Sequence, residues 1–206
     1  MLAQRLAAFA RQEGIRLSKG EVERLASLDE MLVRWGRAVR VSGLETLEDR
    51  FERYYAEALA ASRWLRERGL AVDVGSGGGS PALPMAMCSP ELGWALLEPN
   101  RRRALFVEEA AKQLGLRNVS VERARLEGYR PSGAVQVVSC RGLSLDGRRL
   151  RTLAGWLAGE GRLLLFTGKG RSQEFVRTRL GLPGDWIGRH ALAPTRRSWL
   201  AVWERA

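Results

Sequence analysis

The stretch Asp73-Val-Gly-Ser-Gly-Gly-Gly-Ser-Pro-Ala-Leu-Pro-Met85 decides the fold of this chain. It completes the apolar run LAVDV (70–74), which predicts a buried strand, and it runs into a short predicted helix over 81–88. Its glycines let the backbone turn sharply and approach a ligand closely. The start of the helix offers free N–H groups. A strand, a glycine turn and a helix in this order predict a ligand-binding turn in an α/β sheet.

Further strands and helices alternate downstream of this turn. The apolar runs predict strands over 93–98, 118–122, 134–139 and 161–168, and the polar-apolar periodicity predicts helices over 101–114, 150–157 and 171–180. Alternation of this kind indicates a parallel, doubly wound sheet. The last two β-like runs, 187–192 and 198–204, have no helix between them and predict an antiparallel hairpin on that sheet. We therefore expect a Rossmann-like α/β fold with a seven-stranded, mostly parallel sheet.

The segment before the sheet is predicted to be helical. Ser18 and Glu21 have the spacing of a capping box. Apolar residues then recur every three or four positions from Val22 to Trp35, which is one helix face. Glycines at 36 and 43 are expected to bracket a break, and a further helix is expected to start at Thr46 and end at Gly69. We expect 1–69 to form an N-terminal helical extension and 70–206 the α/β domain.

The amino-acid composition limits the classes of function that this protein can have. The 206 residues include 34 Lys and Arg against 23 Asp and Glu, a net charge of +11. This excess suggests a polyanionic partner, usually nucleic acid, although a solvated surface without a partner is the alternative. No apolar run approaches the roughly 20 residues of a membrane span. Two cysteines and one histidine form no disulfide framework and no metal pattern, so we expect a protein of the reducing cytosol without a metal.

Three details of the glycine turn separate its possible ligands. Position 80, where a dinucleotide fingerprint has its last glycine, is Ser80. The acid Asp73 lies two residues before the first glycine, where it would repel a pyrophosphate. Glu98 ends the second strand, where it can accept hydrogen bonds from both ribose hydroxyls. These details favour S-adenosylmethionine; a dinucleotide enzyme and a purely structural turn remain alternatives.

The same stretches resemble one family of class I S-adenosylmethionine-dependent methyltransferases. The run DVGSGGGSPALPM (73–85) is similar to the signature D-x-G-[ST]-G-x-G-x-P-G-x-P-L of the ribosomal RNA small-subunit methyltransferase G family, also called glucose-inhibited division protein B. LLEPNRRRALFVEEAAKQLGL (96–116), the segment 118–127, CRGL (140–143) and FTGKG (166–170) resemble its later motifs, and the tryptophan motif around Trp35 is similar to an earlier one. The resemblance covers nearly the whole chain.

The resemblance implies methylation of N7 of one guanosine in small-subunit ribosomal RNA. It also implies that the backbone near Leu126 and Glu127 holds the adenine of the donor. The glycine turn, the acid after the second strand and this resemblance together give the expected donor-binding residues: Asp73, Gly75, Ser76, Gly77, Gly79, Glu98, Leu126 and Glu127. Guanine N7 has a free lone pair at neutral pH and needs no general base, which suits a chain whose single histidine, His190, lies in its tail.

Arg141 is the residue expected to act on the substrate. It follows the fourth strand, and ligands bind at the carboxyl ends of such strands. We expect it to orient a phosphate or a base edge in the cleft that Gly77 opens; a salt bridge at the sheet rim is the alternative. Cys140, beside it, is expected to be a small buried residue. The expected RNA contacts are Arg101, Arg102, Arg103, Arg141, Lys169, Arg196 and Arg197, with Trp199 available for stacking.

The chain departs from the family pattern near the donor and substrate face. Tyr54 stands in place of a histidine, Ala58 in place of a serine, Arg40 in place of an asparagine and Ala82 in place of a glycine. These departures leave open a methyltransferase acting on another RNA or a small molecule, or a non-catalytic RNA-binding module. We expect ribosomal RNA or the small ribosomal subunit as partner, no membrane, and a monomer.

Overall fold

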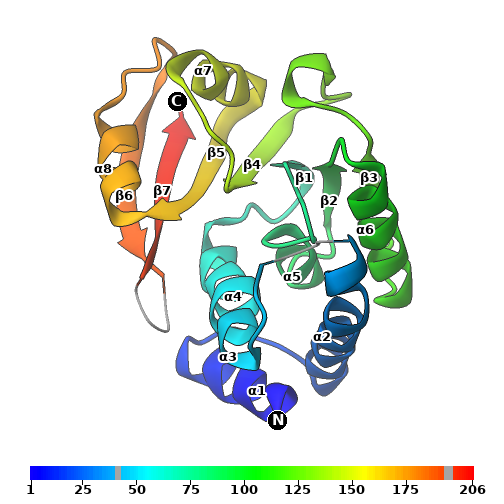
Figure 1. Ribbon diagram of the computed structural model, residues 1–206. Helices are drawn as coiled ribbons and strands as arrows, with labels where there is room; N and C mark the ends of the chain where they lie inside the picture. Colours follow the sequence, from blue (N-terminus) through cyan, green and yellow to red (C-terminus); the bar gives the residue numbers. More distant parts are fainter. Residues whose placement is uncertain (40–42, 193–196) are drawn as a thin grey trace.

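The computed structural model describes residues 1–39, 43–192 and 197–206 as one mixed α/β structure (Figure 1). Its seven strands form a single sheet in the order β3-β2-β1-β4-β5-β7-β6. The strands are β1 (Gly69–Val74), β2 (Leu92–Leu97), β3 (Val119–Glu122), β4 (Val135–Arg141), β5 (Leu157–Gly168), β6 (Gly184–Ala191) and β7 (Ser198–Arg205). β1 to β5 pair in parallel, whereas β7 pairs antiparallel with β5 and with β6. The predicted seven-stranded, mostly parallel sheet with a terminal hairpin is confirmed.

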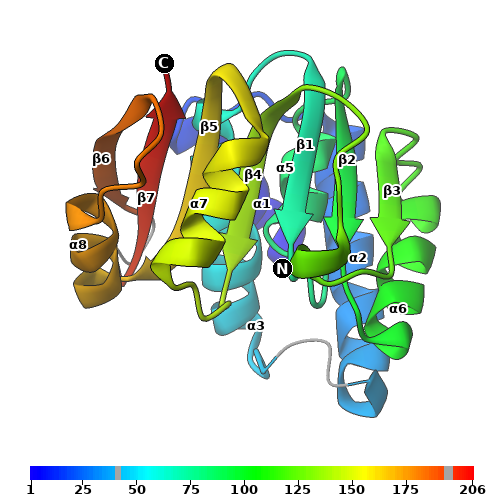
Figure 2. The same cartoon turned by 90° about the horizontal axis from the view of Figure 1, so that it is seen from above.

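Helices cover both faces of this sheet, as Figure 2 shows from above. The helices are α1 (Leu2–Gln12), α2 (Lys19–Val39), α3 (Leu47–Asp49), α4 (Glu57–Ala61), α5 (Ala82–Met87), α6 (Arg101–Gln113), α7 (Gly147–Trp156) and α8 (Lys169–Arg177). Side chains alternate along each strand, so Ala71 and Val137 pack under the N-terminal helices, α5 and α6, whereas Val72 and Val138 pack under α7 and α8. None of the helices described is long and apolar enough to cross a membrane.

The two helix starts predicted from the sequence have the expected hydrogen bonds. Ser18 and Glu21 exchange hydrogen bonds between side chain and backbone at the start of α2. The Thr46 hydroxyl accepts from the Asp49 N–H. The structure adds a third cap, which the sequence analysis did not name: the Asn100 side chain accepts from the N–H groups of Arg102 and Arg103. Each of these side chains satisfies N–H groups that have no partner inside the helix.

Two predicted helix ends are wrong. α2 continues through Gly36 to Val39, because one glycine inside a long helix costs only about 1 kcal/mol. The last N-terminal helical segment ends at Trp64 in a 3₁₀ turn, η2 (Ser62–Trp64), and Gly69 is the first residue of β1. Trp35, expected on the buried face of α2, is 41% exposed.

One segment of the N-terminal region is a π-helix, η1 (Arg50–Ala56), which lies between α3 and α4. The Glu57 N–H bonds to the Glu52 carbonyl, five residues back, and not to the Arg53 carbonyl as an α-helix requires. Asp29 holds η1 against α2 through a buried ion pair with Arg50, whose Nε lies 2.7 Å from Asp29 Oδ1. The π-helical turn therefore leaves the Arg53 carbonyl available at the edge of the sheet.

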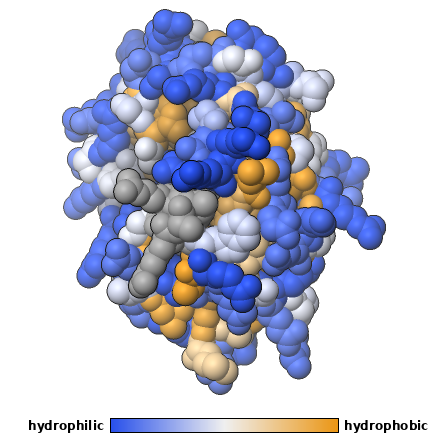
Figure 3. All heavy atoms as spheres, turned by 45° about the vertical axis from the view of Figure 1, so that its right-hand side comes forward, coloured by the Kyte–Doolittle hydropathy of each residue, from blue (hydrophilic) through white to orange (hydrophobic). Residues whose placement is uncertain are grey.

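Hydrophilic side chains dominate the face of the molecule drawn in Figure 3, with smaller apolar patches between them. The N-terminal helices share one hydrophobic core with the sheet, since Leu25 and Tyr55 belong to the same buried cluster as Trp94 of β2. The division of the chain at residues 69 and 70 stays a prediction.

Candidate active site

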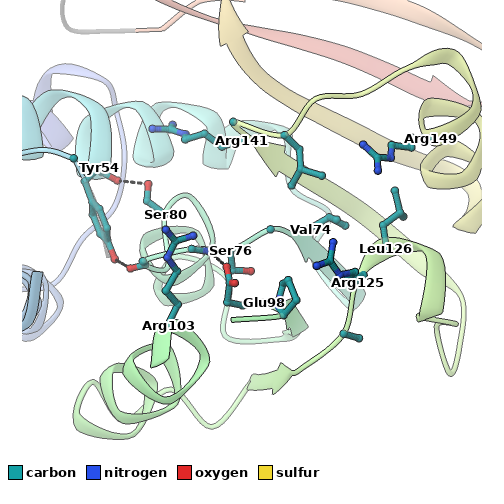
Figure 4. Close-up of a pocket in the computed structure, with 18 of the residues that line it drawn as sticks. Tyr54, Val74, Ser76, Ser80, Glu98, Arg103, Arg125, Leu126, Arg141 and Arg149 are labelled. Carbon is teal, nitrogen blue, oxygen red and sulfur yellow. Dashed lines mark hydrogen bonds between the residues drawn. The ribbon is translucent and has the colours of Figure 1, made fainter. Parts of the chain in front are cut away.

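A pocket of about 610 Å³ lies at the carboxyl ends of β1, β2 and β4. Figure 4 shows its labelled lining residues: Tyr54, Val74, Ser76, Ser80, Glu98, Arg103, Arg125, Leu126, Arg141 and Arg149. Ligands of open α/β sheets bind at this edge, where the strand order reverses. We call this cavity the donor pocket. The expected donor-binding residues Gly75, Ser76, Gly77, Glu98, Leu126 and Glu127 all line it.

The glycine turn forms one wall of the donor pocket. The N–H groups of Gly75 and Ser76 both donate to the Leu97 carbonyl, which ties the turn to the end of β2. Gly75, Gly77 and Gly79 all have positive φ angles. A Cβ on Gly75 would lie 2.1 Å from the Leu143 side chain and one on Gly79 2.4 Å from Leu83, so these two positions are closed by packing. A Cβ on Gly77 would meet no atom closer than 3.8 Å, so of these three glycines Gly77 alone opens into free space.

Asp73 lies in β1, two residues before Gly75, and is 1% exposed; it is buried behind the residues that line the donor pocket and is not one of them. Its Oδ1 accepts a hydrogen bond of 2.6 Å from the Ser139 hydroxyl on β4. Its Oδ2 is buried and has no hydrogen-bond partner within the described parts of the chain. Burial raises the pKa of Asp73 to about 6, against the lowering effects of the Ser139 and Ser76 hydroxyls. A buried carboxylate oxygen without a partner fits a ligand that brings a cation or an N–H donor.

Glu98 joins the second strand to the glycine turn. Its carboxylate accepts from the Gly77 N–H at 2.9 Å and from the Asn100 N–H at 2.8 Å, and the residue is 4% exposed. Since an ionised carboxylate has about four acceptor positions, Glu98 can hold the turn and still accept from a ligand's hydroxyls. The sequence does not show the first of these roles, because the Gly77 contact spans two strands.

Leu126 and Glu127 form the opposite wall, in a 3₁₀ turn, η3 (Leu126–Gly128). Leu126 is buried, and the Glu127 side chain is turned to Arg149 of α7, with Oε1 3.0 Å from the Arg149 Nη2. The pKa of Glu127 is lowered by a hydrogen bond from its own backbone and by Arg149. The apolar side chain of Leu126 and the backbone of this turn together form a surface that suits a flat, uncharged ring.

A second pocket, of about 520 Å³, adjoins the first. We call it the acceptor pocket. Arg53, Arg141, Gly142 and Leu143 line both cavities and form the boundary between them. The remaining walls of the acceptor pocket carry apolar side chains such as Phe166 and Phe175, and the carboxylates of Asp49, Glu52 and Glu57.

Arg141 occupies the boundary but does not point freely into the cleft. One guanidinium nitrogen, Nη1, donates to the Arg53 carbonyl, and Nη2 lies 3.0 Å from Glu57 Oε2. The group also lies 4.6 Å from the centre of the Phe166 ring. Arg141 therefore has features of both predicted roles: it lines the cleft beside Gly77, and it forms an ion pair at the rim of the sheet. Figure 4 shows its side chain turned toward the N-terminal helical segment.

Glu57 is a site residue that sequence reasoning missed. It is 3% exposed, and burial raises its pKa against the lowering effect of Arg141 and a hydrogen bond from Ser198. The only sequence signal was its place four residues after Arg53 in a motif already noted for its departures. The ion pair with Arg141 depends on tertiary packing, so no local pattern reveals it.

The departures from the family pattern have structural consequences. Tyr54 is buried, and its hydroxyl donates to the Gly78 carbonyl at 2.6 Å, while the Ser80 hydroxyl donates to the Tyr54 carbonyl. The tyrosine therefore supports the glycine turn. Ala58 and Ala82 are fully buried in the core beneath it. Arg40 lies outside the described residues.

The expected RNA contacts divide into two groups. Arg101, Arg102 and Arg103 begin α6, and of these only Arg103 lines the donor pocket. Lys169 begins α8, and Arg197 lines the acceptor pocket before β7. Arg196 lies outside the described residues. Trp199 is not freely available for stacking, since the Arg189 guanidinium already lies 4.5 Å from its ring centre.

Comparison with known proteins identifies the chain's relatives. The sequence profile of the GidB family, described as rRNA small subunit methyltransferase G, matches residues 21–180. Proteins named ribosomal RNA small subunit methyltransferase G are similar to it. The one from Ectopseudomonas mendocina is 32% identical over 69% of this chain and 67% of its own. The one from Halorhodospira halophila is 32% identical over 79% of this chain and 77% of its own.

Solved structures share the fold at lower identity. A precorrin-6y C5,15-methyltransferase from Geobacter metallireducens has a TM-score of 0.57 at 17% identity, covering 72% of this chain and 87% of its own. An rRNA methylase from Streptococcus thermophilus has a TM-score of 0.54 at 12% identity, covering 72% of this chain and 94% of its own. The resemblance read from the motifs is confirmed, and this chain belongs to the rRNA small subunit methyltransferase G family.

Proposed function

We propose that this protein transfers a methyl group from S-adenosylmethionine to N7 of a guanosine in small-subunit ribosomal RNA. The observation that carries the proposal is the buried Oδ2 of Asp73, which has no hydrogen-bond partner among the described residues and lies directly before the glycine turn that lines a cavity of about 610 Å³. A cation bearing N–H donors is the ligand that such an oxygen accepts. Family membership supports the same activity.

The residues of the donor pocket fit the methyl donor part by part. Asp73 Oδ2 would hold the amino group, and the open space over Gly77 would take the chain that follows it. The remaining acceptor capacity of Glu98 suits the ribose hydroxyls. Leu126 and the turn at Glu127 would contact the adenine ring. When bound, S-adenosylmethionine supplies an electrophilic methyl group on a positively charged sulfur.

The acceptor atom needs no deprotonation, and the lining residues agree with this. Among the described residues of the two pockets there is no histidine, and burial raises the pKa of Cys140 to about 12, so it stays a thiol. Burial raises the pKa of Tyr54 far above neutrality. We infer that Arg141 and its neighbours accelerate the reaction by orienting the base and by shaping the field around it.

Arginines surround the mouth of the donor pocket. Arg53, Arg103, Arg125, Arg141 and Arg149 all line it, and they come from five different segments of the chain. Arg141 and Arg149 are held in ion pairs with Glu57 and Glu127, so the guanidinium groups of Arg53, Arg103 and Arg125 are the ones that would contact phosphates over the pocket. Arg101 and Arg102 at the start of α6, and Arg197 before β7, would extend this contact with phosphates. We infer that the protein acts as a monomer in the reducing cytosol; light scattering of the purified protein would test the monomeric state.

Two measurements test the proposed function. Calorimetry should show binding of S-adenosylmethionine, which a non-catalytic RNA-binding module would lack. Mass mapping of small-subunit ribosomal RNA from a deletion strain should show the loss of one 7-methylguanosine, and the gene supplied on a plasmid should restore it. An unchanged modification map would point instead to another RNA or to a small-molecule substrate.

A further inference from the structure

The ion pair between Arg141 and Glu57 places a hydrogen-bond donor beside an acceptor at the wall of the acceptor pocket. Arg141 Nη2 and Glu57 Oε2 are 3.0 Å apart, and both residues line that pocket. Two elements fix the pair. The π-helical turn η1 presents the Arg53 carbonyl to the guanidinium, and the Phe166 ring lies under it. The order of donor and acceptor along this wall is therefore set by the fold.

Arg141 and Glu57 can both form further hydrogen bonds with a ligand. The Nε atom of Arg141 is buried and has no hydrogen-bond partner within the described residues, and the buried Nη2 atom meets only the Glu57 carboxylate, at 3.0 Å. Buried donors without acceptors are unfavourable, and an acceptor delivered by a ligand would relieve them. Glu57, in turn, already accepts a hydrogen bond from the Ser198 hydroxyl, which a stronger donor could replace.

Guanine carries the complementary groups in the complementary order. Along one side of the base, the O6 acceptor is followed by the N1–H and N2–H₂ donors, and N7 lies on the other side of O6. A guanidinium beside a carboxylate presents one donor followed by two acceptors, the arrangement with which cytosine pairs with guanine. Adenine would place its N6 donor against Arg141 and its N1 acceptor against Glu57, so both contacts would be repulsive.

We propose that Arg141 and Glu57 together read the acceptor base as guanine, Arg141 by donating to O6 and Glu57 by accepting from N1–H and N2–H₂. This inference rests on the proposed function. It also orients the reaction, because a guanine held in this way has N7 next to the Arg141 boundary that both pockets share. Arg141 must then bond O6 and leave the N7 lone pair free for the methyl group.

The test compares guanosine with inosine, which lacks only the 2-amino group. Once the methylated position has been mapped, synthetic RNAs that carry either nucleoside at that position are assayed with the wild-type protein. Loss of a donor to a buried carboxylate should lower kcat/KM about 10- to 100-fold for inosine. If the wild type methylates N7 of both nucleosides equally well, the base-reading role of Glu57 is refuted while the proposed function stands. If the deletion strain loses no 7-methylguanosine, so that no such position can be mapped, the proposed function itself fails.

The variant Glu57→Gln separates base reading from structural support. Its amide keeps the size of the side chain but turns an N–H₂ group toward the donors of guanine. We expect the guanosine rate to fall and the ratio of guanosine to inosine rates to approach one. A merely structural role would lower both rates and leave the ratio unchanged, which would overturn the inference. Glu48→Gln is the matched control, because it removes an exposed ion pair with Arg5 outside both pockets and should leave the ratio as in the wild type.

Discussion

The substitution Asp73→Asn separates ligand binding from stability at one buried position. Asparagine keeps the size of the side chain and can still accept the 2.6 Å hydrogen bond from Ser139, but it loses the negative charge. Hydrogen bonds to charged groups contribute about 1.5–3 kcal/mol, so we expect affinity for S-adenosylmethionine to fall about 10- to 150-fold at pH 7.5. Calorimetry measures this change directly.

The pH dependence of folding gives a second, independent readout of the same residue. Burial raises the pKa of Asp73 to about 6 from its ordinary value of 3.8. A raised pKa means that the folded protein takes up this proton before the unfolded chain does, so Asp73 destabilises the fold above pH 6 and this cost is relieved as the pH falls. Between pH 7.5 and 4.5 the wild type should therefore gain about 2 kcal/mol of unfolding free energy relative to Asp73→Asn.

Urea unfolding of both proteins across this pH range measures the difference. Constant costs of the substitution, such as an unpaired amide N–H₂, cancel because only the change with pH is compared. Donor affinity of the wild type should also weaken below pH 6, whereas that of the variant should not. A stability difference that stays constant with pH, or a variant that binds the donor as tightly as the wild type, would refute the role of a buried, ionisable Asp73.

Three further outcomes are expected. Gly77→Asp should abolish donor binding in a folded protein, because the new side chain enters the open space over Gly77 and adds a charge near Asp73; unchanged affinity by calorimetry would exclude this placement. Arg141→Ala should lower methyl transfer about 100-fold with donor affinity nearly intact, and Arg141→Lys should recover only part of the rate, since a point charge cannot replace a planar fork; a full-rate alanine variant in single-turnover assays would remove Arg141 from the site. RNA affinity should fall steeply between low and physiological salt, and replacing Arg101, Arg102 and Arg103 by glutamine should flatten the slope by up to about 3; an unchanged slope in filter binding would show that α6 does not contact phosphate.

Much of this protein follows from local sequence alone. The strand, glycine turn and helix around Asp73 are defined by neighbouring residues, and so are the caps at Ser18 and Thr46, which bond within three residues. The absence of a helix between the last two strands predicted their antiparallel pairing. These features need only short-range geometry, and the motif resemblance added the family.

Tertiary structure decided what those segments do for one another. α2 runs past the glycine at 36 to Val39 because one glycine inside a long helix costs only about 1 kcal/mol, whereas the later helical segment ends at Trp64 in a 3₁₀ turn, five residues before Gly69. The unpartnered oxygen of Asp73 exists because β4 supplies a single hydroxyl from Ser139 to a carboxylate on β1. The pairing of Arg141 with Glu57 requires a π-helical turn to meet the end of a strand far away in the chain. Periodicity and motif spacing describe each segment separately. Burial and long-range contacts arise only when the segments pack against one another, and it is this packing that sets the charge and the orientation of the side chains in the site.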